Sequence, residues 1–115
     1  MSPYIETLES VAVSFSATGD NIVIAAPGNG KYLAIDFLAF VPSADVTVTL
    51  YEGPSSSGTA LSGAMPFKAN QPIIMENAIH NEHGVITCDN NLAFNISSTG
   101  SSTITGLCRY RIINK

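Results

Sequence analysis

The feature that most constrains the fold of this 115-residue chain is a regular alternation of apolar residues with other residues in several short segments. In VAVSFSAT (11–18), Val11, Val13 and Phe15 share one parity, and VTVTLYE (46–52) alternates in the same way. Successive side chains of a β-strand point to opposite faces of a sheet, so a period of two predicts strands with one buried face. No long stretch of the chain shows the periodicity of an amphipathic helix.

Segments of strand composition recur at about ten-residue spacing, and turns rich in Gly, Pro, Ser and Asn separate them. These segments are 11–18, 21–26, 31–41, 46–52, 72–79, 85–91, 92–97 and 103–113. Because no helical segments lie between them, the parallel crossovers of an α/β protein are not expected. The pattern predicts an all-β fold, a single-domain antiparallel β-sandwich or jelly roll with eight or nine short strands.

The long segment KYLAIDFLAFV (31–41) is apolar at positions of both parities, which predicts a strand in the centre of a sheet. Asp36 interrupts this segment between Ile35 and Phe37. We expect its carboxyl group to be half-buried with a raised pKa or to face a partner, as a structural group rather than a catalytic one.

A chain of this length forms one domain. We expect residues 1–10 to form an N-terminal arm or edge segment and residues 11–115 to form the sandwich. Tyr4, Ile5 and Leu8 are the apolar residues of the arm and are the predicted interface residues. We expect this arm either to lie on a neighbouring subunit or to pack across its own sandwich.

Charged residues make up only 12% of the chain, and the net charge is −4. Nucleic-acid binding requires clustered Lys and Arg, whereas the basic residues here are scattered, so no nucleic-acid partner is expected. Arg109 and Arg111 share one strand face and are expected to solvate a sheet edge. No signal peptide and no apolar run of about 18 residues is visible, which predicts a soluble protein that is made in a cytoplasm and has no membrane partner.

The two cysteines, Cys88 and Cys108, are expected to stay reduced in such a compartment, although a disulfide is conceivable if their strands are neighbours. A zinc site could be built from His80, Glu82 and His83 together with Cys88. The spacing lacks a second ligand pair, so a polar loop is the preferred interpretation and no metal is predicted.

Other catalytic arrangements are also missing from the sequence. It has no G-x-S-x-G motif and no phosphate-binding loop, and its carboxylates fall mostly at strand ends, where charges are ordinarily solvated. Tyr32, Tyr51 and Tyr110 could contribute to a sugar-binding platform, but Trp is absent. We therefore predict no enzyme activity, no catalytic residues and no cofactor.

Two long segments of the chain nevertheless carry a family likeness. LYEGPSSSGTALSGAMPFKANQPIIMENA and VITCDNNLAFNISSTGSSTITGLCRYRII resemble small β-sandwich virion structural proteins of tailed bacteriophages. The matching positions are Leu61, Ser62, Gly63, Met65, Phe67, Ala69, Asn70, Leu92, Ile96, Ser97, Gly106 and Tyr110.

The resemblance implies a capsid decoration or cement protein on the head surface of a virion, made in the host cytoplasm. Its implied partners are the major capsid protein and further copies of itself, often as a homotrimer. A tail, neck or fibre module that binds a receptor or glycan is the alternative. The HNEHG loop (80–84) departs from the family pattern, which leaves the attachment site open.

The segment 60–78 is itself interpreted as a corner between two strands. Gly63 is expected to permit a tight bend, and Met65 and Phe67 are expected to point into the core. KAN (68–70) then turns the chain, and Pro72 begins the next strand, where no backbone N–H is needed for pairing.

Overall fold

The computed structural model describes residues 8–16, 18–54, 57–77, 84–100 and 102–114. These residues form ten β-strands, and two of the strands, β5 and β8, are only two residues long. The strands are β1 (Glu9–Phe15), β2 (Gly19–Ile24), β3 (Lys31–Pro42), β4 (Val46–Glu52), β5 (Thr59–Ala60), β6 (Met65–Phe67), β7 (Ile73–Glu76), β8 (Ile86–Thr87), β9 (Phe94–Thr99) and β10 (Ile104–Asn114).

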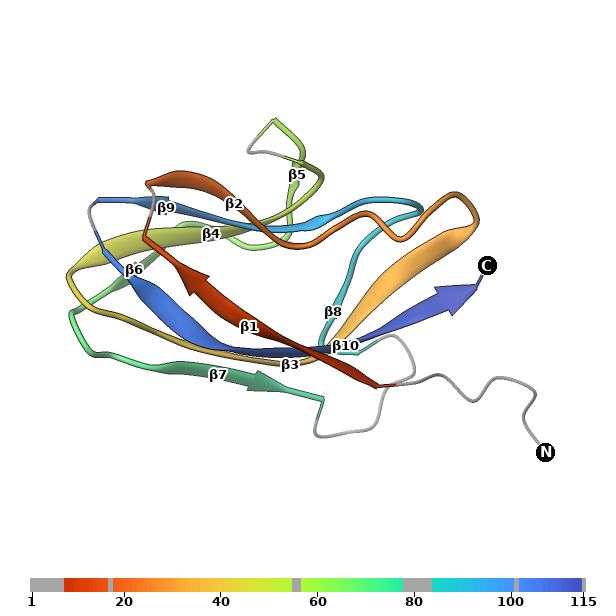
Figure 1. Cartoon of the computed structure of the whole chain (residues 1–115). Coiled ribbons are helices and arrows are strands. Elements are labelled where there is room, and N and C mark those ends of the chain that lie inside the picture. Colours follow the sequence, from red (N-terminus) through yellow and green to blue (C-terminus); the bar gives the residue numbers. More distant parts are fainter. Residues whose placement is uncertain (1–7, 17, 55–56, 78–83, 101, 115) are drawn as a thin grey trace.

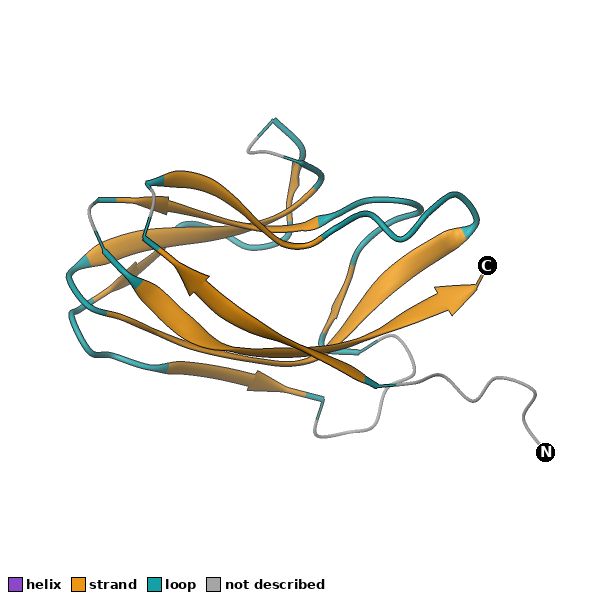
Figure 2. Ribbon diagram, viewed as in Figure 1, coloured by secondary structure: helices purple, strands orange, loops and turns teal. Residues whose placement is uncertain are grey.

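The strands form two antiparallel sheets that pack face to face (Figures 1 and 2). Sheet I has the order β1-β10-β3-β7, and β8 also pairs with β3. Sheet II has the order β2-β9-β4-β5, and β6 also pairs with β4. The predicted all-β antiparallel sandwich is confirmed. When the two-residue strands β5 and β8 are left out, sheet I has the order β1-β10-β3-β7 and sheet II has the order β2-β9-β4-β6. These are the strand orders of a jelly roll.

The core lies between the two sheets and consists of the inward-facing residues of both. Val13, Leu38 and Ile104 contribute from sheet I, and Val48, Leu50 and Ile96 contribute from sheet II. Phe40 and Phe67 meet edge to face across the core, with ring centroids 5.7 Å apart. The alternation read in segments 11–18 and 46–52 therefore identifies the buried faces of β1 and β4 correctly.

A β-bulge in β3 changes the parity of its buried residues, which is one reason why that strand is apolar at both parities. The register with β10 runs from Phe37↔Arg109 to Ile35↔Tyr110 and leaves Asp36 as the extra residue. Leu38 is buried on one side of the bulge and Ile35, of the opposite parity, is buried on the other. The central position of the strand is confirmed, because β10 and β7 flank it.

Two predictions from the sequence need correction. Segment 85–91 forms only the two-residue strand β8, and Cys88 follows it rather than lying within a strand. The expectation that Arg109 and Arg111 solvate a sheet edge is wrong for Arg109, which lies between Ser10 of β1 and Phe37 of β3. Arg111 lies beyond the ladder with β1, and its guanidinium group binds the Asp36 carboxylate.

The corner at 60–78 is largely as predicted. Met65 packs against the core, Phe67 is buried, and a turn closes with the Gln71 amide donating to the Lys68 carbonyl at 3.0 Å. Asn70, with φ of 62°, takes the left-handed conformation in this turn. Gly63 differs from the expectation, because its φ is ordinary and no atom lies near its missing Cβ.

Sheet I depends on a glycine at the closest approach of two of its strands. A Cβ built on Gly106 of β10 would overlap the Ala39 carbonyl oxygen and lie 2.6 Å from Phe40 Cα. Gly106 pairs with Phe40 in the ladder between β10 and β3. Only a residue without a side chain lets these two backbones pair at their present separation.

The part of the chain that the structure describes contains no helix with the length and hydropathy needed to cross a bilayer.

Candidate functional site

The predicted interface residues fall at the margin of the described structure. Tyr4 and Ile5 lie outside the described residues, and Leu8 is 50% exposed directly before β1. Glu9 and Ser10, the last residues of the predicted arm, belong to the edge strand β1. The contact of the arm with a neighbour stays a prediction.

The candidate zinc ligands are only partly described. His80, Glu82 and His83 lie outside the described residues, and Cys88 is buried. Among the residues that the structure describes, no group of three or more His, Cys, Asp or Glu side chains could hold a metal ion.

Both cysteines are buried, unbridged thiols. Burial raises the pKa of Cys88 to about 12, with smaller contributions from the negative charges of Glu52 and the Cys108 thiolate. Burial alone raises the pKa of Cys108 to about 12. A thiolate is the reactive form of cysteine, so both groups are chemically quiet at neutral pH.

We expect neither thiol to react with a disulfide reagent at pH 8 in the folded protein, because a pKa of about 12 leaves only about one thiol in ten thousand ionised at that pH. Since the folded pKa values lie above the unfolded ones, the stability due to the neutral thiols is present below about pH 9 and is lost as the pH rises toward 12. The measurement is thiol titration of native and of guanidine-unfolded protein. A native thiol that reacts as fast as the unfolded control would contradict the burial.

Asp36 is a structural carboxylate with three donors on the outer face of sheet I. Arg111 Nε donates to its Oδ2 at 2.6 Å, and a terminal guanidinium nitrogen of Arg111 donates to Oδ1 at 3.0 Å. Asn77 Nδ2 donates to Oδ1 at 3.2 Å. This bidentate pair joins β3 to β10 beside the bulge, and its side chains are only 19% and 16% exposed.

The three tyrosines considered for a sugar platform do not share one surface. Tyr51 lies on β4 in sheet II, whereas Tyr32 and Tyr110 lie on β3 and β10 in sheet I. All three are only partly exposed, and Tyr110 packs against the core. The structure therefore does not bring them together.

The outer face of sheet I carries an apolar row that crosses all four of its main strands. Ile74 of β7 pairs with Ala39 of β3, Ala39 pairs with Leu107 of β10, and Leu107 pairs with Ala12 of β1. We call these four residues the sheet I row. Ile74 is 65% exposed, the largest exposed fraction of the exposed large hydrophobic residues that the structure describes.

The neighbours of the sheet I row extend it on the same face. Phe37 and Val41 flank Ala39 along β3 and are both partly exposed. The next row is charged, since Glu76 and Arg109 both pair with Phe37. An apolar strip with a charged margin is an arrangement that protein interfaces commonly share.

The sequence pattern alone does not reveal the sheet I row. Ile74 follows Ile73, and Leu107 precedes Cys108, so each strand has apolar residues on both faces. This departure from alternation is the one sign in the sequence that apolar residues lie on the outer face of these strands. Whether the outward residues meet in one row depends on a register between strands far apart in the sequence.

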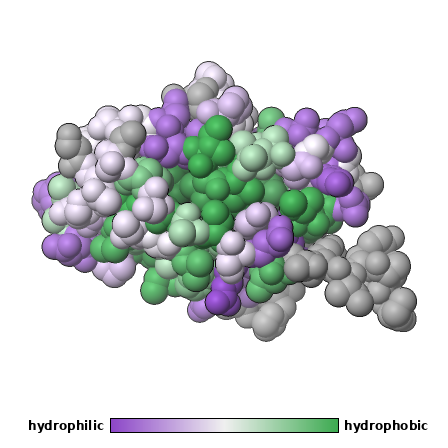
Figure 3. All heavy atoms as spheres, viewed as in Figure 1, coloured by the Kyte–Doolittle hydropathy of each residue, from purple (hydrophilic) through white to green (hydrophobic). Residues whose placement is uncertain are grey.

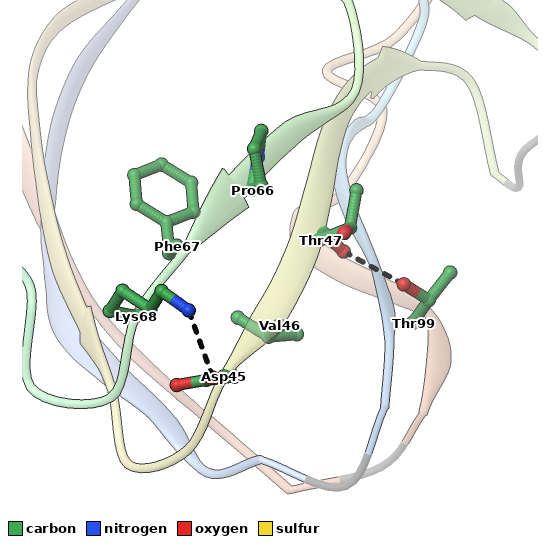
Figure 4. A pocket seen from close by; sticks show the side chains of 7 residues that line it. All are labelled: Asp45, Val46, Thr47, Pro66, Phe67, Lys68 and Thr99. Atoms are coloured by element: carbon green, nitrogen blue, oxygen red, sulfur yellow. Dashed lines mark hydrogen bonds and ion pairs between the residues drawn. The ribbon is translucent and has the colours of Figure 1, made fainter.

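The outer face of sheet II is polar in comparison. Thr47 and Thr49 of β4 pair with Thr99 and Ser97 of β9. A shallow pocket of about 390 Å³ lies at one end of this face (Figure 4). It is lined by Asp45, Val46, Thr47, Pro66, Phe67, Lys68 and Thr99.

Two charged side chains of opposite sign border this pocket. Lys68 Nζ lies 3.6 Å from Asp45 Oδ2, and the Ala69 amide donates to Asp45 Oδ1 at 2.9 Å. The amide donor, followed by the Lys68 charge, lowers the pKa of Asp45. The pocket therefore offers a carboxylate, an ammonium group and hydroxyl groups around a small apolar floor, an arrangement that suits a polar ligand.

The side of the sandwich between β1 and β2 is the third notable surface. Figure 3 shows hydrophobic side chains gathered over the middle of this side. Val11 and Phe15 of β1 and Val23 of β2 are only partly buried against the core there. On β2, Ile22 is 55% exposed.

Comparisons of the chain with models of protein families, with curated proteins and with solved structures gave no match.

Proposed function

We propose that this protein is a structural component of a bacteriophage virion, a decoration or cement protein that binds the head surface. The observation that carries the proposal is the sheet I row, an apolar strip on the outer face of an antiparallel sheet, exposed at Ala12 and Ile74 and partly exposed between them. The sequence resemblance to small virion proteins supports the same role. Its partners would be the major capsid protein and further copies of itself, for which the resemblance implies a trimer.

The physical basis of the role is burial of apolar area across more than one capsid subunit. Each Å² of apolar surface removed from water contributes about 25 cal/mol before the cost of association. Stable protein interfaces bury about 1,600 Å² in total, so the sheet I row would form the centre of a wider contact. A capsid held together from outside in this way resists dissociation on heating.

We expect Ile74→Lys to weaken binding to preformed heads at least tenfold, because the substitution places a charge in the middle of the contact. The measurement is co-sedimentation of labelled protein with heads, together with the melting temperature of the loaded heads. Ile22→Lys is the matched control, since Ile22 has a similar exposed fraction and lies in the other sheet. Equal losses for the two variants would contradict the assignment to sheet I, and failure of the wild-type protein to bind heads would contradict the proposed role.

The second candidate is a tail, neck or fibre module that binds a glycan receptor. The pocket on sheet II favours it, because Asp45, Lys68 and Thr99 supply charged and hydroxyl groups beside Phe67. Under this alternative, the labelled protein binds host cells or a glycan array instead of heads. Lys68→Ala would then reduce that binding while Ile74→Lys leaves it unchanged.

A further inference from the structure

The two sheets have four edges in the described part of the chain, and three of them carry features that block pairing with another strand. At the far edge of sheet I, β7 and β8 are short. In sheet II, β5 has two residues and β6 contains Pro66. The other edge strand of sheet II, β2, begins with Gly, Asp and Asn and has an irregular register between Ile22 and Ile24. Short strands, proline, charge and bulges are the usual means of protecting an edge.

The fourth edge, β1, has none of these protecting features beyond its first residue. It pairs with β10 over seven consecutive residue pairs without a register shift. Its sequence, ESVAVSF, contains no Lys and no Pro, and its one charged residue stands at its first position. On the side away from β10, no described strand pairs with it. A regular edge of this kind is a template for another strand.

The sequence of β1 indicates which strand fits. Residues 10–14 read Ser-Val-Ala-Val-Ser, which is the same in both directions about Ala12. Two copies in antiparallel orientation about Ala12 place Val11 opposite Val13, Ser10 opposite Ser14, and Glu9 opposite Phe15. No like charges face each other in this register, and β-branched side chains meet on the core side.

We propose that β1 pairs with β1 of a second copy of this chain around a two-fold axis at Ala12, so that the two copies of sheet I become one continuous sheet. Pairing covers Val11 and Phe15, which are only partly buried in the single copy. In a two-fold contact the same surface of both copies is used, and the palindrome then places identical residues opposite each other. Two-fold symmetry is also the commonest symmetry of homo-oligomers. The proposal goes beyond the proposed virion role, because it replaces the implied trimer with a two-fold dimer.

Disulfide trapping tests the register directly. Directly opposite residues of an antiparallel pair have Cα atoms about 4.5–5.5 Å apart, within the range that a disulfide spans. Ala12→Cys is therefore expected to give a covalent dimer on mild oxidation, seen on a non-reducing gel after the remaining thiols are blocked. The native Cys88 and Cys108 are buried and do not compete.

Two further variants serve as controls for that register. Ser10→Cys alone is expected to remain monomeric on the gel, because the two copies of residue 10 would lie four residues apart along the strands, at about 13 Å. Ser10→Cys combined with Ser14→Cys restores the cross-link. Cross-linking of the single Ser10 variant, or failure of the Ala12 variant to cross-link, would overturn the proposed register.

The oligomeric state provides an independent measurement. Sedimentation equilibrium of the wild-type protein is expected to show a dimer, and Ala12→Lys is expected to raise the dissociation constant at least tenfold, because two like charges then face each other. Thr105→Lys is the matched control, since Thr105 is exposed on the neighbouring strand β10. A wild-type monomer or trimer would overturn the two-fold proposal. Binding to heads is measured in a separate experiment. Failure of the dimer proposal and failure of the virion proposal can therefore be told apart.

Discussion

Replacing Gly106 with alanine is expected to destabilise the domain by about 3 kcal/mol or more. The added Cβ would overlap the Ala39 carbonyl oxygen and lie 2.6 Å from Phe40 Cα, so β10 would have to move away from β3. Backbone atoms cannot rotate aside as a flexible side chain can, and β3 and β10 are both central strands of sheet I. Since domains of this kind have about 5–15 kcal/mol of stability, the loss is a large part of the total.

The measurement for Gly106→Ala is urea unfolding followed by far-ultraviolet circular dichroism, with tyrosine emission as a second probe because the chain has no Trp. Gly63→Ala is the matched control, since no atom lies within 4 Å of its Cβ position. That variant is expected to change the unfolding free energy by less than about 1 kcal/mol, in the stabilising direction if at all. Similar losses for the two glycines would show that the close approach of β10 to β3 is not what selects Gly106.

Removing one partner of the Asp36–Arg111 pair is expected to cost about 2–3 kcal/mol. Arg111→Met keeps an aliphatic side chain close in size to the methylene part of arginine but withdraws both guanidinium donors. The Asp36 carboxylate, whose side chain is 19% exposed, then keeps the Asn77 Nδ2 donor at 3.2 Å. Charge-assisted hydrogen bonds contribute about 1.5–3 kcal/mol each, and an unpaired, poorly hydrated charge adds a penalty of its own. Partial exposure keeps the expected loss below that of a fully buried pair.

A double-mutant cycle separates the pair from its surroundings. Asp36→Ala with Arg111→Met is expected to lose less than the sum of the two single losses, by at least about 1 kcal/mol. Lys68→Ala is the matched control, because the side chains of the Lys68–Asp45 pair are 85% and 66% exposed and water screens their attraction, so little stability is expected to be lost. Additive losses in the cycle would mean that Asp36 and Arg111 stabilise the sheet separately.

The buried faces of the strands could be predicted from local pattern, and the pairing between strands could not. Alternation identifies Val13 and Val48 as inward residues because side-chain direction in a strand is a local property. The bulge at Asp36 breaks the alternation in β3, and parity alone cannot distinguish a bulge from a strand that is apolar on both faces. Composition also overestimates the length of the strand in segment 85–91, because it does not show where pairing with β3 ends.

The surface features were beyond local reasoning because each combines residues that are distant in the sequence. Asp36 and Arg111 are 75 positions apart and meet only through the ladder between β3 and β10. The sheet I row needs three strand pairings at once, and the pocket joins residues of three strand regions around Asp45, Phe67 and Thr99. The corner at Met65 and Phe67 was predictable because its bend and its inward residues lie within one short segment.

The central place of β10 in sheet I has a consequence for biosynthesis. β1 and β3 pair with each other only through β10, the most C-terminal of the ten strands, so sheet I cannot close until that strand has left the ribosome. Until then the nascent chain exposes the apolar faces of β1 and β3, and the many distant contacts slow the final collapse. Sheet I is therefore completed only after β10 has been synthesised, and chains truncated before β10 are expected to leave β1 and β3 without their shared partner.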